Sequence, residues 1–186
     1  MNIYSIKVAL RGISPMIWRR LRLAGTTSLA DLHRIIQIAM GWNDDHLHHF
    51  HIHGVDYGIS KPGGIAFRHN AEQVILDDFE FDVGDRFTYT YNYTDWWLCD
   101  VRIEAINTQK EAVPRCFGGS GRKGVRNYYK MDEVIAGAEV LQRVARAGEH
   151  VTVGEVRDWF VQYEAVRFSR LGINQQLKAS FLVRRN

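Results

Sequence analysis

The 186-residue sequence is poor in cysteine and proline, and it lacks the motifs of disulfide-rich and zinc-stabilised domains. It contains two cysteines, Cys99 and Cys116, and three prolines, and it has no C-x-x-C pair and no H-E-x-x-H motif. So few cysteines indicate a reducing, cytoplasmic setting, with a single Cys99–Cys116 bridge left open. A chain of this length can instead bury a hydrophobic core.

Long apolar runs are also lacking. No stretch approaches the roughly 18 consecutive apolar residues that a membrane-spanning helix needs. The first residues, MNIYSIKVAL, alternate like a strand and lack the apolar stretch and cleavage site of a signal peptide. We therefore expect a cytoplasmic protein with no membrane partner.

Charge is unevenly distributed although the net charge is only +3. Residues 1–30 carry five basic side chains and no acid, and residues 31–104 carry 13 acidic against 5 basic side chains. The balance from residue 105 onward is again positive, at +6. The basic segments either converge into a phosphate-binding surface or pair with the acidic middle of the same chain.

Hydrophobic periodicity predicts strands early in the chain and helices late, which favours an α+β fold. We expect an antiparallel or mixed sheet packed against helices, in a single domain over 1–186 whose helical C-terminal part covers about 131–186. Ser28 is the expected N-cap of the first helix, with Asp31 in its first turn. The expected strands are 2–10, 16–23, 41–54, 87–93 and 97–106, the helices are 28–40, 131–147, 153–166 and 171–182, and the main loop is 114–127.

The run GWNDDHLHHFHIHG, residues 41–54, is the densest chemical feature. It holds five of the eight histidines, and imidazole both binds metals and transfers protons near neutral pH. If the run is a strand, His46 and His48 share a face with Phe50 and Ile52. That face carries the large apolar groups, so the pattern predicts two histidines that point inward.

A metal site is the first chemical hypothesis. His46 and His48, with Asp95 and Cys99 from neighbouring strands, offer the N, O and S ligands that zinc takes. No ligand spacing in the sequence fixes such a site. Two structural histidines bonded to carboxylates or backbone are the alternative interpretation.

Nucleic-acid binding is the second hypothesis, because the loop after Pro114 interleaves cations with Phe117, Tyr128 and Tyr129. Cations neutralise phosphates and aromatic rings stack on unpaired bases. No helix-turn-helix, zinc-finger or RNP pattern supports sequence-specific binding. The candidate anion-binding residues are Arg19, Arg20, Arg115, Arg122, Lys123, Arg126 and Lys130.

The order of motifs resembles that of the plasmid pRiA4b ORF-3-like family. The motifs are PMIWRRL (15–21), SLADLHRIIQIAMGWNDDHLHHF (28–50), FTYTYNYTDWW (87–97) and INQQL (173–177). The resemblance covers essentially the whole chain and implies an α+β domain found in plasmid or mobile-element settings. Some members are labelled as insertion-element passenger proteins similar to resolvases, and the family implies no established activity.

Two departures from the family pattern bear on chemistry. Where the family reads Y-D-F-G-D-x-W-x-H, this chain has Asn92, Thr94 and Cys99 in place of the first Asp, the Gly and the His. A C-P-P-E-D block that usually follows the cysteine of the later loop is missing. Recombinase chemistry is not supported, because the serine and tyrosine motifs of such enzymes are absent from the sequence.

The sequence leaves open two functions from different classes. The first is a non-enzymatic module associated with mobile elements that binds nucleic acid or another protein. The alternative is a metal-dependent hydrolytic enzyme centred on His46, His48 and Asp95, with a divalent metal such as zinc as its cofactor.

Overall fold

Alternating side chains in the first two strands produce a hairpin with one buried and one outward face. In the computed structural model, β1 (Ile3–Leu10) pairs antiparallel with β2 (Trp18–Ala24). Tyr4, Ile6 and Val8 of β1 are buried against the core. The residues that the structure describes are 1–12, 16–60, 65–94, 96–108, 111–121 and 168–182.

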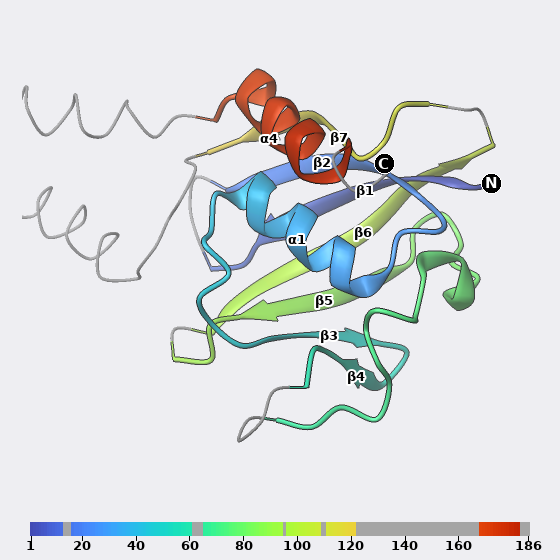
Figure 1. Cartoon of the computed structure of the whole chain (residues 1–186), viewed down its shortest axis with the longest axis vertical. Coiled ribbons are helices and arrows are strands. Elements are labelled where there is room, and N and C mark those ends of the chain that lie inside the picture. The colour runs from blue at the N-terminus through green and yellow to red at the C-terminus, as the bar shows by residue number, and fades with distance from the viewer. Residues whose placement is uncertain (13–15, 61–64, 95, 109–110, 122–167, 183–186) are drawn as a thin grey trace, which may run out of the picture.

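The sheet has seven strands in the order β4-β3-β5-β6-β1-β2-β7, and every strand pair in it is antiparallel (Figure 1). Strand β1 pairs with the central strand β6 on one side and with β2 on the other. This pairing joins the N-terminal hairpin to the β5–β6 hairpin. The remaining strands are β3 (His48–Ile52), β4 (Val55–Tyr57), β5 (Arg86–Tyr91), β6 (Trp97–Asn107) and β7 (Arg115–Ser120).

Helix α1 (Leu29–Met40) begins and ends where its terminal residues predict. The Ser28 hydroxyl accepts a hydrogen bond from the Asp31 N–H at 3.0 Å, which confirms the expected N-cap. Gly41 ends the helix in the left-handed conformation, at φ 78°, and its N–H donates to the Gln37 carbonyl. The helix lies across one face of the sheet (Figure 1) and buries an apolar stripe there.

Helix α4 (Arg170–Leu182) packs beside α1 and against the edge strand β7. Its Ile173 and Leu177 are fully buried. Between them, the Asn174 side chain accepts from the Cys116 N–H at 2.8 Å and donates to the Cys116 carbonyl at 2.9 Å. These two bonds imitate a neighbouring strand, so α4 closes part of an otherwise open sheet edge.

A tight hairpin joins β3 to β4. His53 and Gly54 both have positive φ, at 48° and 79°, as a two-residue type I′ turn requires. The turn sets Phe50 opposite Tyr57 and leaves His53 at the exposed tip. A single turn of 3₁₀ helix, Leu76–Phe79, precedes β5.

The fold is sheet-dominated α+β, which agrees with the expected class. The predicted loop 114–127 is wrong for its first half, because Arg115–Ser120 form β7. The segment forms a strand because it pairs with β2, and its glycine-rich sequence gives no local indication of that pairing. The predicted helices 131–147 and 153–166 lie outside the described residues.

Arg19 connects three elements inside the core. Its side chain points from β2 to the α1 side of the sheet and is fully buried. The guanidinium donates to the carbonyls of Ala39 near the end of α1, at 2.8 Å, and of Ser120 in β7, at 2.7 Å. Phe168 covers it at 4.8 Å. Burial lowers the pKa of Arg19 to about 10, which keeps the group charged at neutral pH.

Neither helix in the described part of the chain is long and apolar enough to cross a membrane.

We expect Arg19→Met to lower the free energy of unfolding by about 2–4 kcal/mol, because it removes the donor to buried carbonyls. Urea unfolding followed by circular dichroism measures the change. Arg20→Met is the matched control, since Arg20 lies next in β2 and forms a solvent-accessible ion pair with Glu104. It should cost less than about 1 kcal/mol. Equal losses in the two variants would contradict the structural role of Arg19.

Candidate functional site

The turn after α1 brings distant polar groups to one place beside the sheet. After Gly41 the chain reverses toward the sheet, and Asp44 adopts the left-handed conformation at φ 59°. His48 then opens β3. His33 reaches the same place from the buried face of α1.

His33, Asp44 and His48 form a compact group, called here the histidine cluster. The His33 and His48 rings stack in parallel, 3.4 Å between centroids and 8° between planes. His33 Nε2 lies 2.7 Å from Asp44 Oδ1. One donor atom from each residue lies within 4.8 Å of the other two. Both histidines are buried, whereas the Asp44 side chain is half exposed.

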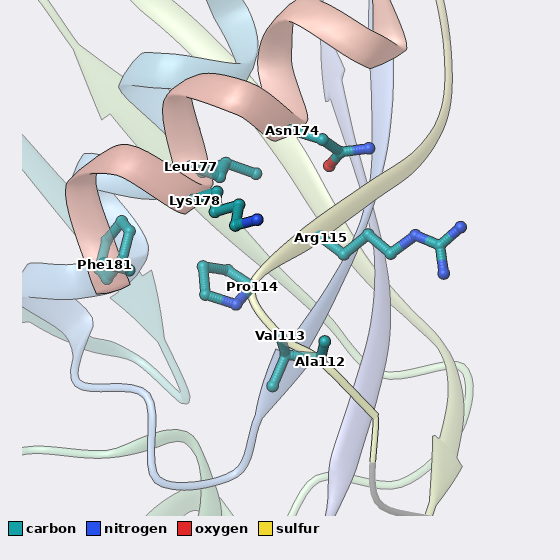
Figure 2. A pocket seen from close by; sticks show the side chains of 8 residues that line it. All are labelled: Ala112, Val113, Pro114, Arg115, Asn174, Leu177, Lys178 and Phe181. Atoms are coloured by element: carbon teal, nitrogen blue, oxygen red, sulfur yellow. The ribbon is translucent and has the colours of Figure 1, made fainter. Parts of the chain in front are cut away.

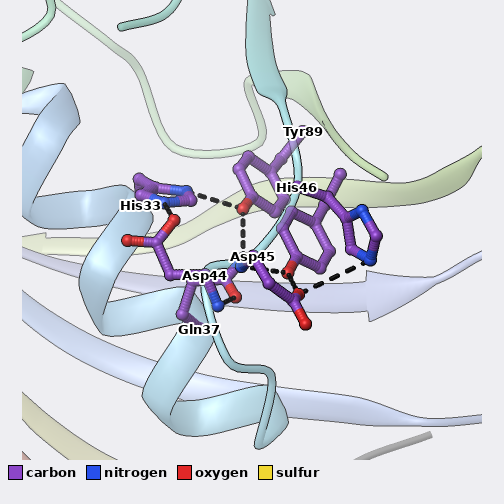
Figure 3. Close-up of polar contacts among 7 residues, drawn as sticks. His33, Gln37, Asp44, Asp45, His46 and Tyr89 are labelled. Atoms are coloured by element: carbon purple, nitrogen blue, oxygen red, sulfur yellow. Dashed lines mark hydrogen bonds and ion pairs between the residues drawn. The ribbon is translucent and has the colours of Figure 1, made fainter. Parts of the chain in front are cut away.

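A hydrogen-bond network orients His33 and Asp44 of the cluster (Figure 3). Gln37 accepts from the Asp44 N–H through Oε1 at 3.0 Å and donates from Nε2 to the Tyr89 hydroxyl at 2.8 Å. Tyr89 Oη lies 2.8 Å from His33 Nδ1. Burial raises the pKa of Tyr89 well above its usual value, so the phenol stays protonated. Tyr89 therefore fixes the ring of His33 from the side opposite Asp44.

A carboxylate–phenol pair lies beside the cluster. The Tyr91 hydroxyl donates to Asp45 Oδ1 at 2.6 Å and accepts from the Asp45 N–H at 3.1 Å. Burial, followed by the hydrogen bond to Asp45, raises the pKa of Tyr91. Trp42 stacks on Tyr91 at 5.0 Å between centroids and closes this side of the core.

The predicted metal ligands do not all come together. His48 is in the cluster and faces inward with Phe50 and Ile52, as expected. The inward orientation expected for His46 is wrong, because β3 begins only at His48. The His46 side chain is half exposed, and its Nε2 lies 3.5 Å from Asp45 Oδ1 (Figure 3).

Cys99 and Asp95 also have different positions from those expected. Cys99 is buried opposite Tyr89, two strands from β3, and it is outside the cluster. Asp95 lies outside the described residues. Sequence reasoning missed His33 and Asp44, although a histidine within the apolar stripe of the helix was a signal.

The cluster offers two imidazole nitrogens and a carboxylate at the boundary between core and solvent. These groups bind divalent transition metals, and without a metal they can transfer protons. The exposed side of Asp44 gives solvent access to the group.

A row of four cations crosses the other face of the sheet. Register places Arg86 opposite Arg102, Arg102 opposite Lys7, and Lys7 opposite Arg20, on the adjacent strands β5, β6, β1 and β2. We call these four residues the cation row. Both described α-helices lie on the opposite side of the sheet (Figure 1).

The predicted anion-binding residues divide into three groups. Arg19 is fully buried and cannot reach an anion in solution, so its prediction was wrong. Arg20 lies in the cation row, and Arg115 is exposed at the start of β7. Arg122, Lys123, Arg126 and Lys130 lie outside the described residues.

A pocket of about 340 Å³ lies between α4 and the segment leading into β7 (Figure 2). Its walls are mainly apolar, with Arg115 and Lys178 at the sides. None of the eight residues that line it is a His, Cys, Asp or Glu, so the lining has no acid–base pair and no metal ligand of these kinds.

Both cysteines are buried free thiols that lie three strands apart in the sheet order. Burial raises the pKa of Cys99 and of Cys116. We expect both to react with a thiol reagent such as DTNB on the order of 100-fold more slowly in the native protein than in concentrated guanidinium chloride. If either cysteine reacted with DTNB in the native protein as fast as in denaturant, its thiol would be accessible, contrary to this prediction.

The comparisons agree with the motifs of the sequence. Residues 2–171 match the plasmid pRiA4b ORF-3-like protein family. An uncharacterized protein of Sinorhizobium fredii, y4hQ, is 31% identical over 104 residues, which are 55% of this chain and 54% of that protein. The chain therefore spans about half the length of that relative.

A solved structure shares the fold. The crystal structure of MM3350, a protein of unknown function from Methanosarcina mazei Go1, is 31% identical with a TM-score of 0.60. The match covers 81% of this chain and 91% of that one. The match over most of the sequence and the shared fold establish that the chain belongs to the plasmid pRiA4b ORF-3-like family.

Proposed function

We propose that this protein binds single-stranded nucleic acid on the outward face of its sheet. The observation that carries the proposal is the cation row, in which each residue lies directly opposite the next across four adjacent strands. Like charges directly opposite one another in a sheet are destabilising. A polyanion bound along the row relieves that repulsion.

The spacing of the row suits an extended anionic chain. Neighbouring strands lie about 4.8 Å apart, so the four residues span roughly 14 Å across the sheet. Lys7, Arg86 and Arg102 take part in none of the ion pairs found among the described residues. These three side chains supply the charge of the row that no ion pair among the described residues neutralises.

Acidic residues pair with Arg20 of the row and with two further cations, Arg22 and Arg11. Glu104 pairs with Arg20 at 2.7 Å and Glu111 with Arg22 at 2.6 Å, while Asp100 pairs with Arg11. This pairing leaves Lys7, Arg86 and Arg102 as the members of the row that no ion pair among the described residues neutralises.

Aromatic rings flank the cations. Trp18 lies under Lys7, whose Nζ is 5.3 Å from the ring centroid, and under Arg20 at 4.8 Å. Phe117 lies under Arg22 at 4.9 Å. A sheet that presents rings beside cations suits unpaired bases, which stack on aromatics while their phosphates meet the charges.

The family adds a biological setting. Membership of a family named for a plasmid open reading frame supports a role close to mobile DNA. No sequence-specific readout is proposed, because the row contacts phosphates and stacking accepts any base.

Fluorescence anisotropy with labelled single-stranded DNA and RNA 20-mers tests the proposal. The Lys7→Gln/Arg102→Gln double variant should lower the slope of log K against log salt by about 1.4, because each lost phosphate contact contributes about 0.7 on a single strand. At 0.1 M salt, affinity should fall roughly 10- to 30-fold.

Arg34→Gln is the matched control. Arg34 lies on α1, on the opposite side of the sheet, in an exposed ion pair with Asp31. It should bind like the unaltered protein. An affinity that does not change with salt concentration, or one that is the same in the double variant and the unaltered protein, would refute the proposal. Binding of acidic peptides but of neither oligonucleotide would point to a protein partner instead.

A further inference from the structure

We infer that the histidine cluster is a binding site for a divalent transition-metal ion, with zinc as the ion that its donors suit best. His33, Asp44 and His48 supply two nitrogens and one oxygen. The inference concerns the helix-covered side of the sheet and is independent of nucleic-acid binding.

The separations among the donors are close to those that a metal needs. With bonds of about 2.0–2.1 Å, tetrahedral ligand atoms lie about 3.3 Å apart. One atom from each of the three residues already lies within 4.8 Å of the others, and His33 Nε2 is 2.7 Å from Asp44 Oδ1. The two rings are nearly parallel, so binding an ion requires them to rotate until their in-plane lone pairs converge.

The surroundings of His33 match those of a metal ligand. Metal-bound histidines characteristically make a hydrogen bond through the ring nitrogen that does not bind the metal. Here Nδ1 contacts the Tyr89 hydroxyl, which leaves Nε2 directed at Asp44 (Figure 3). Gln37 holds both Tyr89 and the Asp44 backbone, so one buried side chain positions two of the three ligands.

The backbone conformation of Asp44 directs its carboxylate. Its φ is 59°, a left-handed conformation that aspartate adopts more readily than most residues. In this conformation the carboxylate turns back toward His33 while its outer side remains open to solvent. This exposure gives an ion a path from solvent to the carboxylate.

Three protein ligands with an open fourth position are typical of catalytic rather than structural zinc sites. An ion held by His33, Asp44 and His48 would lower the pKa of a coordinated water and so supply hydrolytic chemistry. The ligand set differs from the predicted set of His46, His48, Asp95 and Cys99. His48 is shared, whereas His33 and Asp44 are new and Cys99 is not part of the cluster.

Isothermal titration of EDTA-treated, untagged protein with zinc chloride tests the inference, with cobalt(II) absorption as a second readout of the ligand geometry. We expect one equivalent of zinc per chain, and at least tenfold weaker binding in Asp44→Asn and in His48→Gln. Asp44→Asn keeps the size of an exposed side chain, so its loss of binding is not explained by unfolding. Urea unfolding of each variant verifies the fold.

His46→Ala and His51→Ala/His53→Ala are the matched controls, because these histidines are exposed and lie in the same segment. Both should bind zinc like the unaltered protein. Absence of zinc binding in the unaltered protein would overturn the inference. Loss of binding in the control variants with retention in Asp44→Asn would also overturn it, by assigning the zinc to surface histidines.

Discussion

The buried guanidinium of Arg19 is the contact on which the rest of the structure depends. It bonds to the end of α1, to the edge strand β7 and to its own strand, through the carbonyls of Ala39, Ser120 and Trp18. Carbonyls at a helix end have no partner within the helix and carry partial negative charge, so a buried cation suits them. Phe168, just before α4, covers the same group. Helix, sheet and C-terminal segment thus share one charged centre.

The position of α1 in turn determines the candidate metal site. His33 and Gln37 lie on its buried face, and the turn after Gly41 returns Asp44 to them. Any movement of the helix along the sheet would separate His33 from Tyr89, because Tyr89 belongs to β5 and not to the helix. The site is therefore assembled by packing rather than by one local motif.

The alternation of the strands separates two kinds of chemistry. In β5, Tyr89 faces the histidine cluster while Arg86 faces outward, and in β2 Arg19 and Arg20 point to opposite sides. A register slip of one residue would exchange the two faces. A charged row and a buried polar network can therefore coexist in one thin sheet.

Local signals in the sequence were sufficient for most elements. Ser28 and Asp31 mark the start of α1, and the alternation of His48, Phe50 and Ile52 identifies the buried face of β3. Local signals failed where the partner is distant in sequence. The strand at Arg115–Ser120 depends on β2 and on Asn174, and nothing in its glycines predicts either.

The candidate site shows the same limit. His48 could be identified because its neighbours set its face, whereas His46 was misplaced because the strand had not yet begun. Arginine usually lies at the surface, and only the carbonyls around Arg19 explain why it is buried.

By itself, the sequence determined the periodicities, the helix start and the family, since these rest on neighbouring residues and on motif order. Only the tertiary structure decided that His33 meets His48 and that four cations align across the sheet, because those contacts join residues far apart along the chain.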